Sequence, residues 1–314
     1  MSKKIALLFP GQGSQYVGMG KALYDSDPQA RELFQRAEEL TQLPLRRLCF
    51  EGPMEELTQT VNLQPAVTVL NLALYNALHR AGVQPSFVAG HSLGEYSALY
   101  AAGVLSEADT LKAVQHRGQL MHREALKHPG AMAAIVGLPI PEVVEMLAPI
   151  VNRGFFALAN YNTPEQLVVS GAPVEVEEAM ALAKAAGARA VPLAVSGAWH
   201  SPLMAGATAD FTALLQTLTF QPPQTTILLN VSGLPESQPE VIREYMARQL
   251  TSPVQWTQII HHILAAGVEV WAEVGPKNVL KGLVRKTVPK DHPLEFYNVE
   301  DPAGLEKFVQ AVSS

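Results

Sequence analysis

The ten residues Val88-Ala-Gly-His-Ser-Leu-Gly-Glu-Tyr-Ser97 decide the fold that this chain is expected to adopt. They hold the pattern Gly-x-Ser-x-Gly, with a short apolar strand predicted at residues 87–89 and a helix at residues 93–102. In a strand–turn–helix of this kind the serine lies on a sharp turn at the carboxyl edge of a sheet, where its hydroxyl is exposed. The stretch therefore predicts an α/β fold with Ser92 as a candidate nucleophile.

Two glycines flank this serine symmetrically. A turn this tight brings the chain close to itself two residues before and two residues after the serine, and Gly90 and Gly94 remove the Cβ atoms that would collide. At the N-terminus of the following helix, free N–H groups, including that of Leu93, are placed to stabilise an oxyanion. The alternative is a glycine-rich turn in which Ser92 only caps the helix.

Strands and helices alternate along most of the chain around this turn. Pro65 is expected in the first turn of its helix. The alternation predicts a parallel sheet that helices cover on both faces. The strands are expected at residues 5–9, 87–89, 226–230, 268–274 and 294–299, and the helices at residues 31–40, 64–78, 93–102, 107–126, 202–218, 239–249, 253–266, 278–286 and 302–312.

The order of elements changes in the middle of the chain. Strands and helices follow there as β-α-β-β-α-β, at residues 131–137, 141–148, 155–160, 166–171, 174–186 and 189–195. This is the order of a split, ferredoxin-like motif, and turn-rich residues border it on both sides. We therefore predict a discontinuous large domain of residues 1–127 and 198–314, and a small domain of residues 128–197.

The composition suits a globular protein with a sizeable core, since 48% of the residues are hydrophobic and 17% are charged. A net charge of −6 argues against a nucleic-acid partner. The single cysteine, Cys49, cannot form an internal disulfide and is predicted to lie in the core. The N-terminal apolar run is too short for a signal peptide, and no later run is long enough to span a bilayer. We therefore expect a cytoplasmic protein that does not bind membranes.

A serine nucleophile needs a base, and the chain has nine histidines. His91 directly precedes Ser92, but neighbouring side chains diverge in such a turn, so His91 is a poor base. His200 stands in Val195-Ser-Gly-Ala-Trp-His-Ser-Pro-Leu203, where the small domain returns to the large one. Because active sites gather in crevices between domains, His200 is the better candidate, although spacing alone leaves the choice open.

Arg117 is a third candidate site residue. Within its predicted helix, Val114, Arg117 and Met121 share one face. A guanidinium inside an apolar stripe needs an anionic partner, because burying it unpaired is costly. The partner is either an acidic side chain elsewhere in the fold or a substrate carboxylate held by two hydrogen bonds, and the residues alone do not decide between them.

Several short motifs follow one another along the chain. They are Phe9-Pro-Gly-Gln-Gly-Ser-Gln15, Gly90-His-Ser-Leu-Gly-Glu-Tyr96, His116-Arg-Gly118, Asn160-Tyr-Asn162, His200-Ser-Pro-Leu-Met204, Pro253-Val-Gln-Trp256 and Glu273-Val-Gly-Pro276. Together they resemble the malonyl-CoA:acyl carrier protein transacylases of type II fatty-acid synthesis, and also the acyltransferase domains of polyketide synthases, over nearly the whole chain. The fold of that family, a hydrolase-like parallel-sheet core with a ferredoxin-like insert, agrees with the predicted layout.

The resemblance implies a role for each matching catalytic residue. Ser92 would take the malonyl group as an ester, and His200 would be its base and then the acid for the leaving thiolate. The family has no third carboxylate, and a backbone carbonyl orients the histidine, here that of Gln249. Gln12 and the amide of Leu93 would form the oxyanion hole.

The resemblance also implies which residues bind the substrate. Arg117 would pair with the malonyl carboxylate. Of its two possible partners, the resemblance therefore implies the substrate carboxylate and not an acidic side chain of the fold. Gln64, Asn160 and Asn162 stand where the family lines its pocket. Trp199, directly before the histidine, favours malonyl over methylmalonyl, because an indole there leaves little room for an α-methyl branch.

Two positions depart from related sequences. Gly197 stands where polyketide domains often have His or Tyr. The family commonly shows Gly-Pro-Gly-Lys where this chain has Gly275-Pro-Lys-Asn278, which concerns only the start of the following helix.

The implied reaction is ping-pong. Malonyl-CoA acylates Ser92, CoA leaves, and the phosphopantetheine thiol of an acyl carrier protein takes the malonyl group. No metal or cofactor is implied, and the family's habit suggests a monomer. A basic stripe offers a docking site for the acidic carrier, unless it is merely a solvated helix face. The stripe consists of Lys277, Lys281, Arg285 and Lys286, with Arg46 and Arg47 elsewhere.

Three other functions are compatible with parts of this pattern. An acyl hydrolase of the same fold generally lacks the pocket arginine, so Arg117 argues against it. A free-standing transferase of a polyketide pathway is hardly separable by sequence. A non-catalytic scaffold would not need Ser92, His200 and Arg117 together.

Overall fold

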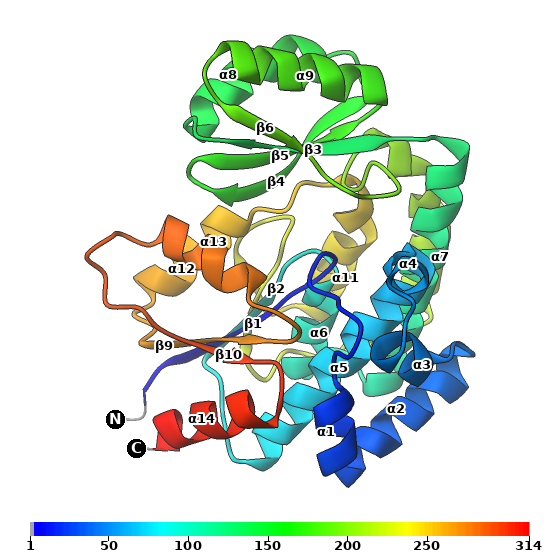
Figure 1. The fold of residues 1–314 in the computed structure, drawn as a ribbon, viewed down its shortest axis with the longest axis vertical. Coiled ribbons are helices and arrows are strands. Elements are labelled where there is room, and N and C mark those ends of the chain that lie inside the picture. Colours follow the sequence, from blue (N-terminus) through cyan, green and yellow to red (C-terminus); the bar gives the residue numbers. More distant parts are fainter. Residues whose placement is uncertain (1–2, 314) are drawn as a thin grey trace.

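A six-stranded sheet forms the centre of the larger part of the protein in the computed structural model, which describes residues 3–313 (Figure 1). Five neighbouring strands are parallel, and the short edge strand β8 is antiparallel to β7. The predicted parallel sheet is thereby confirmed, with β8 as an addition that sequence reasoning missed. The strands, in spatial order, are β10 (Glu295–Val299), β9 (Val270–Val274), β1 (Ile5–Phe9), β2 (Phe87–Gly90), β7 (Thr226–Leu228) and β8 (Pro235–Glu236).

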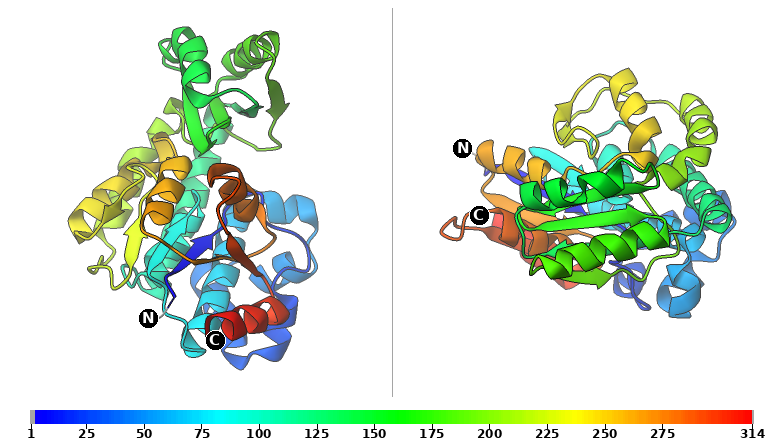
Figure 2. Two further views of the ribbon diagram at one scale, coloured as in Figure 1. Left: turned by 90° about the vertical axis from the view of Figure 1, so that its left-hand side faces the viewer. Right: turned by 90° about the horizontal axis from the view of Figure 1, so that it is seen from above.

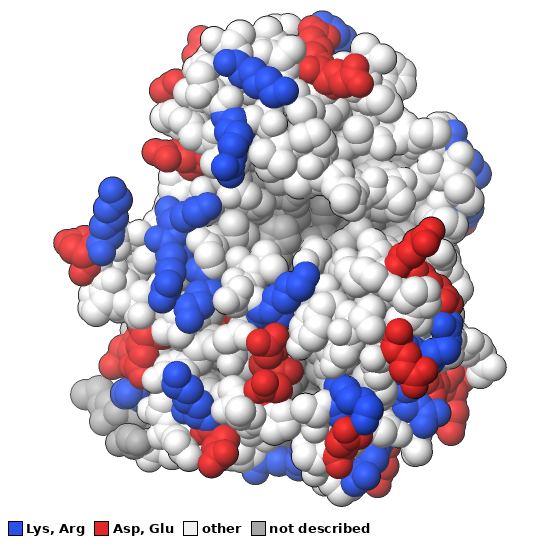
Figure 3. Space-filling model, viewed as in Figure 1, with Lys and Arg blue, Asp and Glu red and all other residues white. Residues whose placement is uncertain are grey.

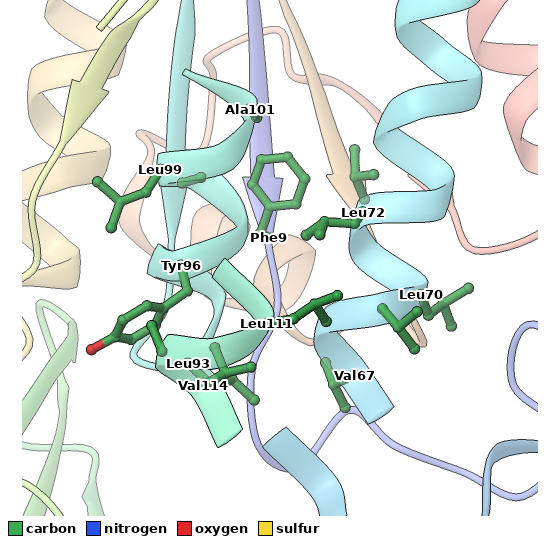
Figure 4. Close-up of a cluster of buried hydrophobic side chains, with 14 of the residues drawn as sticks. Phe9, Val67, Leu70, Leu72, Leu93, Tyr96, Leu99, Ala101, Leu111 and Val114 are labelled. Carbon is green, nitrogen blue, oxygen red and sulfur yellow. The ribbon is translucent and has the colours of Figure 1, made fainter. Parts of the chain in front are cut away.

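Strand β1 is buried on both faces because helices cover both sides of the sheet. Leu7 and Phe9 pack against one group of helices, and Figure 4 shows Phe9 among the buried side chains of three of them, α5, α6 and α7. Ala6 and Leu8 point the other way, toward α12 and α13. The first group comprises α2 (Pro28–Thr41), α5 (Thr60–Arg80), α6 (Gly94–Ala101), α7 (Glu107–Lys127), α10 (Thr208–Gln216), α11 (Pro239–Arg248) and α14 (Pro302–Ser313), and the second comprises α12 (Trp256–Ala265) and α13 (Val279–Thr287).

Several predicted helix bounds are wrong. Helix α5 begins at Thr60, so Pro65 lies inside the helix, where its ring removes one hydrogen bond without ending the helix. The helix expected at residues 202–218 is divided into a 3₁₀ segment, η1 (Pro202–Ala207), and α10. A second 3₁₀ segment, η2 (Gln249–Thr251), follows α11. The short helices α1 (Lys21–Ser26), α3 (Leu45–Phe50) and α4 (Met54–Thr58) were not predicted.

The segment between α7 and η1 forms a second, antiparallel sheet, which lies above the larger part in Figure 1 and stands apart from it in Figure 2. Its strand order, β4-β5-β3-β6, is that of the predicted ferredoxin-like motif, and the fold class is confirmed. The domain limits at residues 128 and 197 remain a prediction. The elements are β3 (Ala131–Val136), α8 (Ile140–Val151), β4 (Phe156–Thr163), β5 (Gln166–Gly171), α9 (Pro173–Ala185) and β6 (Arg189–Pro192).

The two faces of this second sheet have different partners. Ala133 and Ile135 pack under α8 and α9, whereas Met132 and Ala134 belong to the core cluster of the larger part.

Strand β4 is also joined to the larger part through its main chain. The N–H of Tyr161 donates to the carbonyl of Val254 at 2.9 Å, and the N–H of Val254 donates to the carbonyl of Ala159 at 2.8 Å.

Within residues 3–313, no helix is both long enough and apolar enough to cross a membrane. Cys49 is buried in the core of the larger part, as predicted.

Candidate active site

Ser92 lies on the turn between β2 and α6. Its φ is +52°, in the left-handed region. A Cβ on Gly94 would lie 2.0 Å from the carbonyl oxygen of Phe9, and a Cβ on Gly90 would lie 2.0 Å from the main chain of Gly94. The two glycines are therefore required by the close approach of β1, β2 and α6, which is the steric reason predicted for them.

His200 approaches the serine from the residues directly before η1. Its Nε2 lies 2.7 Å from Oγ of Ser92. Its Nδ1 lies 3.0 Å from the carbonyl oxygens of Gln249 and Ser252. Because carbonyl oxygens only accept, Nδ1 carries the proton, which leaves Nε2 to accept the hydrogen bond from the Ser92 hydroxyl.

The surroundings of His200 favour its neutral form. Burial, and after it the positive charge of Arg117, lower the pKa of His200 to about 3. At neutral pH the imidazole is therefore uncharged, so its Nε2 lone pair is available to take a proton. Two carbonyl oxygens, and no carboxylate of residues 3–313, bond to Nδ1 and orient the ring.

Arg117 extends from α7 into the site and is buried, with 1% of its surface exposed. Its guanidinium donates to Oε1 of Gln249 from Nε at 3.0 Å, to Oε1 of Gln64 from Nη1 at 3.0 Å, and to Oγ of Ser92 from Nη2 at 3.2 Å. All three acceptors are neutral oxygen atoms. No Asp or Glu in the part of the chain that the structure describes forms a salt bridge with Arg117.

Gln249 connects several parts of the site through its side chain. Oε1 accepts from Arg117 and, at 3.2 Å, from the hydroxyl of Tyr96. Nε2 donates to the carbonyl of Ser92 at 3.0 Å and to Oε2 of Glu95 at 2.5 Å. The amide thus lies between a cation and a carboxylate, with its oxygen toward Arg117 and its nitrogen toward Glu95.

A cavity of about 210 Å³ opens beside Ser92, in the hollow between the two sheets that Figure 3 shows at the centre of the molecule. Six of the residues predicted to act with Ser92 and His200 line it: Gln12, Leu93, Arg117, Asn160, Asn162 and Trp199. Gln64 does not line the cavity, but its side chain holds two residues that do: Oε1 accepts from Arg117, and Nε2 donates to Sδ of Met121 at 3.2 Å. His91 does not bond Ser92, since its Nε2 donates to Oδ1 of Asn162 at 2.8 Å.

The rest of the cavity wall is largely apolar. Met121, Met132, Val168, Leu193 and Val195 contribute to it, from α7, the second sheet and the segment that follows β6. Helix α13 closes one side with Val279, Leu280 and Leu283. Such a wall excludes water from the polar groups around Ser92. Among residues 3–313, no group of three or more His, Cys, Asp or Glu side chains is arranged to hold a metal ion.

Comparison with known proteins identifies the family. A family model described as acyl transferase domain matches residues 6–301. The chain belongs to this acyl transferase family. The malonyl CoA-acyl carrier protein transacylase of Bacillus subtilis is 42% identical over 311 residues, which cover 98% of this chain and 97% of that protein.

Solved acyl transferases share the whole architecture. An acyl carrier protein S-malonyltransferase from Vibrio cholerae is 40% identical, with a TM-score of 0.92 over 97% of this chain and 99% of that one. A malonyl-transacylase in complex with a type II polyketide synthase acyl carrier protein is 37% identical, with a TM-score of 0.93 over 98% and 99% of the two chains.

Two polar residues of the acyl transferase site had no role assigned from sequence. Glu95 is buried, and its carboxylate accepts from Nε2 of Gln249 and from the N–H of Asn230 at 2.7 Å. Burial raises the pKa of Glu95, while these hydrogen bonds and the charge of Arg117 oppose the rise. The net pKa is about 7. Asn230 follows β7 at the carboxyl edge of the sheet, and that position was a signal for a site residue.

Proposed function

We propose that this acyl transferase moves a malonyl group from malonyl-CoA to the phosphopantetheine thiol of an acyl carrier protein, through an ester on Ser92. The observation that carries the proposal is the position of Arg117. A buried guanidinium held by three neutral oxygens, one of them the serine hydroxyl itself, is a site for an incoming carboxylate. The names of the relatives and the complex with a carrier protein support the same substrates.

The first half of the reaction acylates Ser92. Its hydroxyl oxygen attacks the thioester carbonyl of malonyl-CoA while Nε2 of His200 takes the proton. The C–S bond then breaks, and His200 returns the proton to the CoA thiolate. Since His200 is neutral before the attack, no proton has to leave it first.

The tetrahedral intermediate carries a negative charge on the former carbonyl oxygen. The main-chain N–H groups of Gln12 and Leu93 bind this oxyanion. Neither amide donates to an acceptor within residues 3–313, and both residues line the cavity beside Ser92. The N–H of Ser92 itself is already engaged, because it donates to Oδ1 of Asn230 at 2.7 Å.

The second half reverses these steps with a different thiol. His200 takes the proton of the phosphopantetheine thiol, the sulfur attacks the malonyl ester, and the Ser92 oxygen leaves and recovers its proton. The apolar wall around Met121 and Met132 protects the ester from hydrolysis between the two halves. No metal or cofactor takes part in this scheme, and a single copy of the chain carries every residue that it uses.

A basic surface beside the cavity is the proposed docking site for the carrier protein. Helix α13 lines the cavity with Leu280 and Leu283, and it carries Lys281 and Arg285. Blue side chains gather on that side of the hollow in Figure 3. Lys277, Lys281, Arg285 and Lys286 form no salt bridge with a carboxylate among the described residues, so their charge is available to an acidic partner.

Arg46 and Arg47 do not extend this surface. Arg46 pairs with Glu38 and Arg47 with Glu56, so each of these charges is matched locally. We therefore limit the proposed docking surface to Lys277 and the basic residues of α13, because a cation that is already paired with a carboxylate adds little net charge to attract an acidic partner.

Intact-mass spectrometry tests the proposed function. Wild-type protein and Ser92→Ala are mixed briefly with malonyl-CoA or acetyl-CoA and then with a phosphopantetheine-bearing carrier protein. We expect a malonyl adduct on the wild type alone, which disappears as the carrier gains the same mass. Rapid acetylation by acetyl-CoA, or release of free malonate without an adduct, would instead favour a neutral acyl substrate or a hydrolase.

A further inference from the structure

The side chain of Asn230 is bound to the main chain on both sides of His91. Its Oδ1 accepts from the N–H of Ser92 at 2.7 Å, and its Nδ2 donates to the carbonyl of Gly90 at 2.7 Å. Asn230 has no exposed surface. The amide therefore clamps the turn that carries the nucleophile, from inside the protein.

These two hydrogen bonds take the place of the main-chain hydrogen bonds that a further residue pair would form between β2 and β7. The last partners of β2 and β7 are Ala89 and Leu228, so Asn230 lies opposite His91 in the same register. In a parallel pair, a residue bonds through its N–H and C=O to the two residues that flank its partner. Asn230 makes both bonds with its side chain, while its own carbonyl accepts from the N–H of Gln255 at 2.8 Å.

We propose that Asn230 is a positioning residue of the nucleophile, which extends the β2–β7 ladder into the turn and so fixes the direction of the Ser92 hydroxyl. The proposal rests on the proposed function in that Ser92 is the residue acylated. Ser92 has φ +52°, which a residue with a Cβ rarely adopts unless its surroundings hold it there. A primary amide presents an acceptor and a donor side by side at neutral pH, as this position requires, whereas a carboxyl does so only while it is protonated.

A buried carboxylate joins this clamp to the orientation of the base. Oε1 of Glu95 accepts from the N–H of Asn230 at 2.7 Å, and Oε2 accepts from the side chain of Gln249 at 2.5 Å. The carbonyl of Gln249 in turn accepts from Nδ1 of His200. Ser92 and His200, which are 108 positions apart in sequence, are thus held by one hydrogen-bonded network.

Two variants separate positioning from stability. Asn230→Leu has a side chain of similar size and removes both hydrogen bonds. Asn230→Asp keeps the acceptor for the Ser92 N–H. It has a donor for the Gly90 carbonyl only while its carboxyl is protonated. Asn76→Leu is the matched control, since Asn76 accepts a hydrogen bond from Tyr100 away from the cavity. Single-turnover acylation by saturating malonyl-CoA, its half-saturating concentration and the melting temperature are measured for each.

We expect Asn230→Leu to slow acylation at least 30-fold at saturation, with less than a threefold change in half-saturating concentration. Asn76→Leu should lower the melting temperature and leave acylation unchanged. Asn230→Asp should approach the wild-type rate at the acid end of the pH range and lose rate as pH rises, because the ionised carboxylate repels the Gly90 carbonyl. A wild-type rate in folded Asn230→Leu, or a wild-type pH profile in Asn230→Asp, would overturn the proposal.

A neutral serine reagent keeps this test independent of the proposed substrate. Phenylmethylsulfonyl fluoride reacts with an activated serine without any carboxylate. If the wild type accepts no malonyl group, the same variants are compared by the rate at which this reagent modifies Ser92. A 30-fold slower modification of Asn230→Leu still supports the positioning role, and an equal rate refutes it.

Discussion

The guanidinium of Arg117 and the hydroxyl of Ser92 lie within hydrogen-bond distance, with Nη2 3.2 Å from Oγ. The same oxygen donates to Nε2 of His200. Before substrate binds, the nucleophile therefore lies between the base and the proposed carboxylate-binding group. We expect a malonyl carboxylate that takes over the Arg117 N–H groups to place its thioester carbonyl next to Ser92, so that one residue would provide both selectivity and alignment.

Replacing Arg117 should change selectivity more than reactivity. In Arg117→Ala, acylation by malonyl-CoA should fall about 100-fold or more, corresponding to the roughly 3 kcal/mol of a buried charge-assisted contact. Acylation by acetyl-CoA should not fall, because acetyl has no carboxylate to lose. Arg123→Ala on the same helix is the control, since Arg123 pairs with Glu124 and Asp210 outside the cavity. An equal loss for both substrates would show that Arg117 only supports the fold.

The low pKa of His200 should be visible in the pH dependence of acylation. A base whose pKa is lowered to about 3 stays unprotonated well below pH 6.5, so the single-turnover rate should not fall with protonation of His200 between pH 7 and 5. Glu95, with a pKa raised to about 7, titrates in this window. The profile is therefore measured in both wild type and Glu95→Gln, and a loss centred near pH 6.5 in both would contradict the prediction.

Trp199 should limit the size of the acyl group. The indole lines the cavity and packs on Gly197, where an added Cβ would lie 2.7 Å from the ring. This contact explains why a glycine stands at that position, since a larger side chain would displace the ring. Trp199→Ser should raise the ratio of methylmalonyl to malonyl acylation at least about 10-fold, the range expected for one methyl group in a pocket. Trp199→Phe, which retains most of the bulk, should leave the ratio nearly unchanged. Equal ratios in all three proteins would place the methyl branch elsewhere.

The basic surface on α13 should affect the carrier protein more than malonyl-CoA. Reversing Lys281 and Arg285 to Glu should raise the KM for carrier protein about 10-fold or more at low salt, with the effect declining as ionic strength rises. The KM for malonyl-CoA should stay within twofold. Reversal of the exposed residues Lys112 and Lys184, which do not line the cavity, makes the same change in net charge as a control. If both double variants raise the KM equally, net charge accounts for the effect and the surface has no special role.

Long elements of this fold were predictable, and short ones were not. The alternation of apolar segments predicted the parallel sheet and the β-α-β-β-α-β insert, because each strand is buried by helices adjacent in sequence. Helices α1, α3 and α4 have five or six residues each, which is too few turns for helical periodicity to be visible. Pro65 was misplaced because a proline typical of a first turn is held here within a buried helix.

The site was predictable where chemistry depends on a motif, and less so where it depends on side-chain contacts across the fold. The turn around Ser92 predicted its own geometry, whereas the choice of His200 depended on the resemblance. The side chain of Gln249 and the positions of Glu95 and Asn230 follow from contacts between residues more than 130 positions apart, which no local pattern encodes.

The main-chain hydrogen bonds between β4 and Val254 join the two sides of the crevice. Asn160 lines the cavity next to these bonds, which hold the cavity wall on that side. Such a cavity imposes the same limit on the size of the acyl group, whether the thioester is carried by CoA or by a much larger protein. We therefore expect the same cavity to select the acyl group in both halves of the reaction.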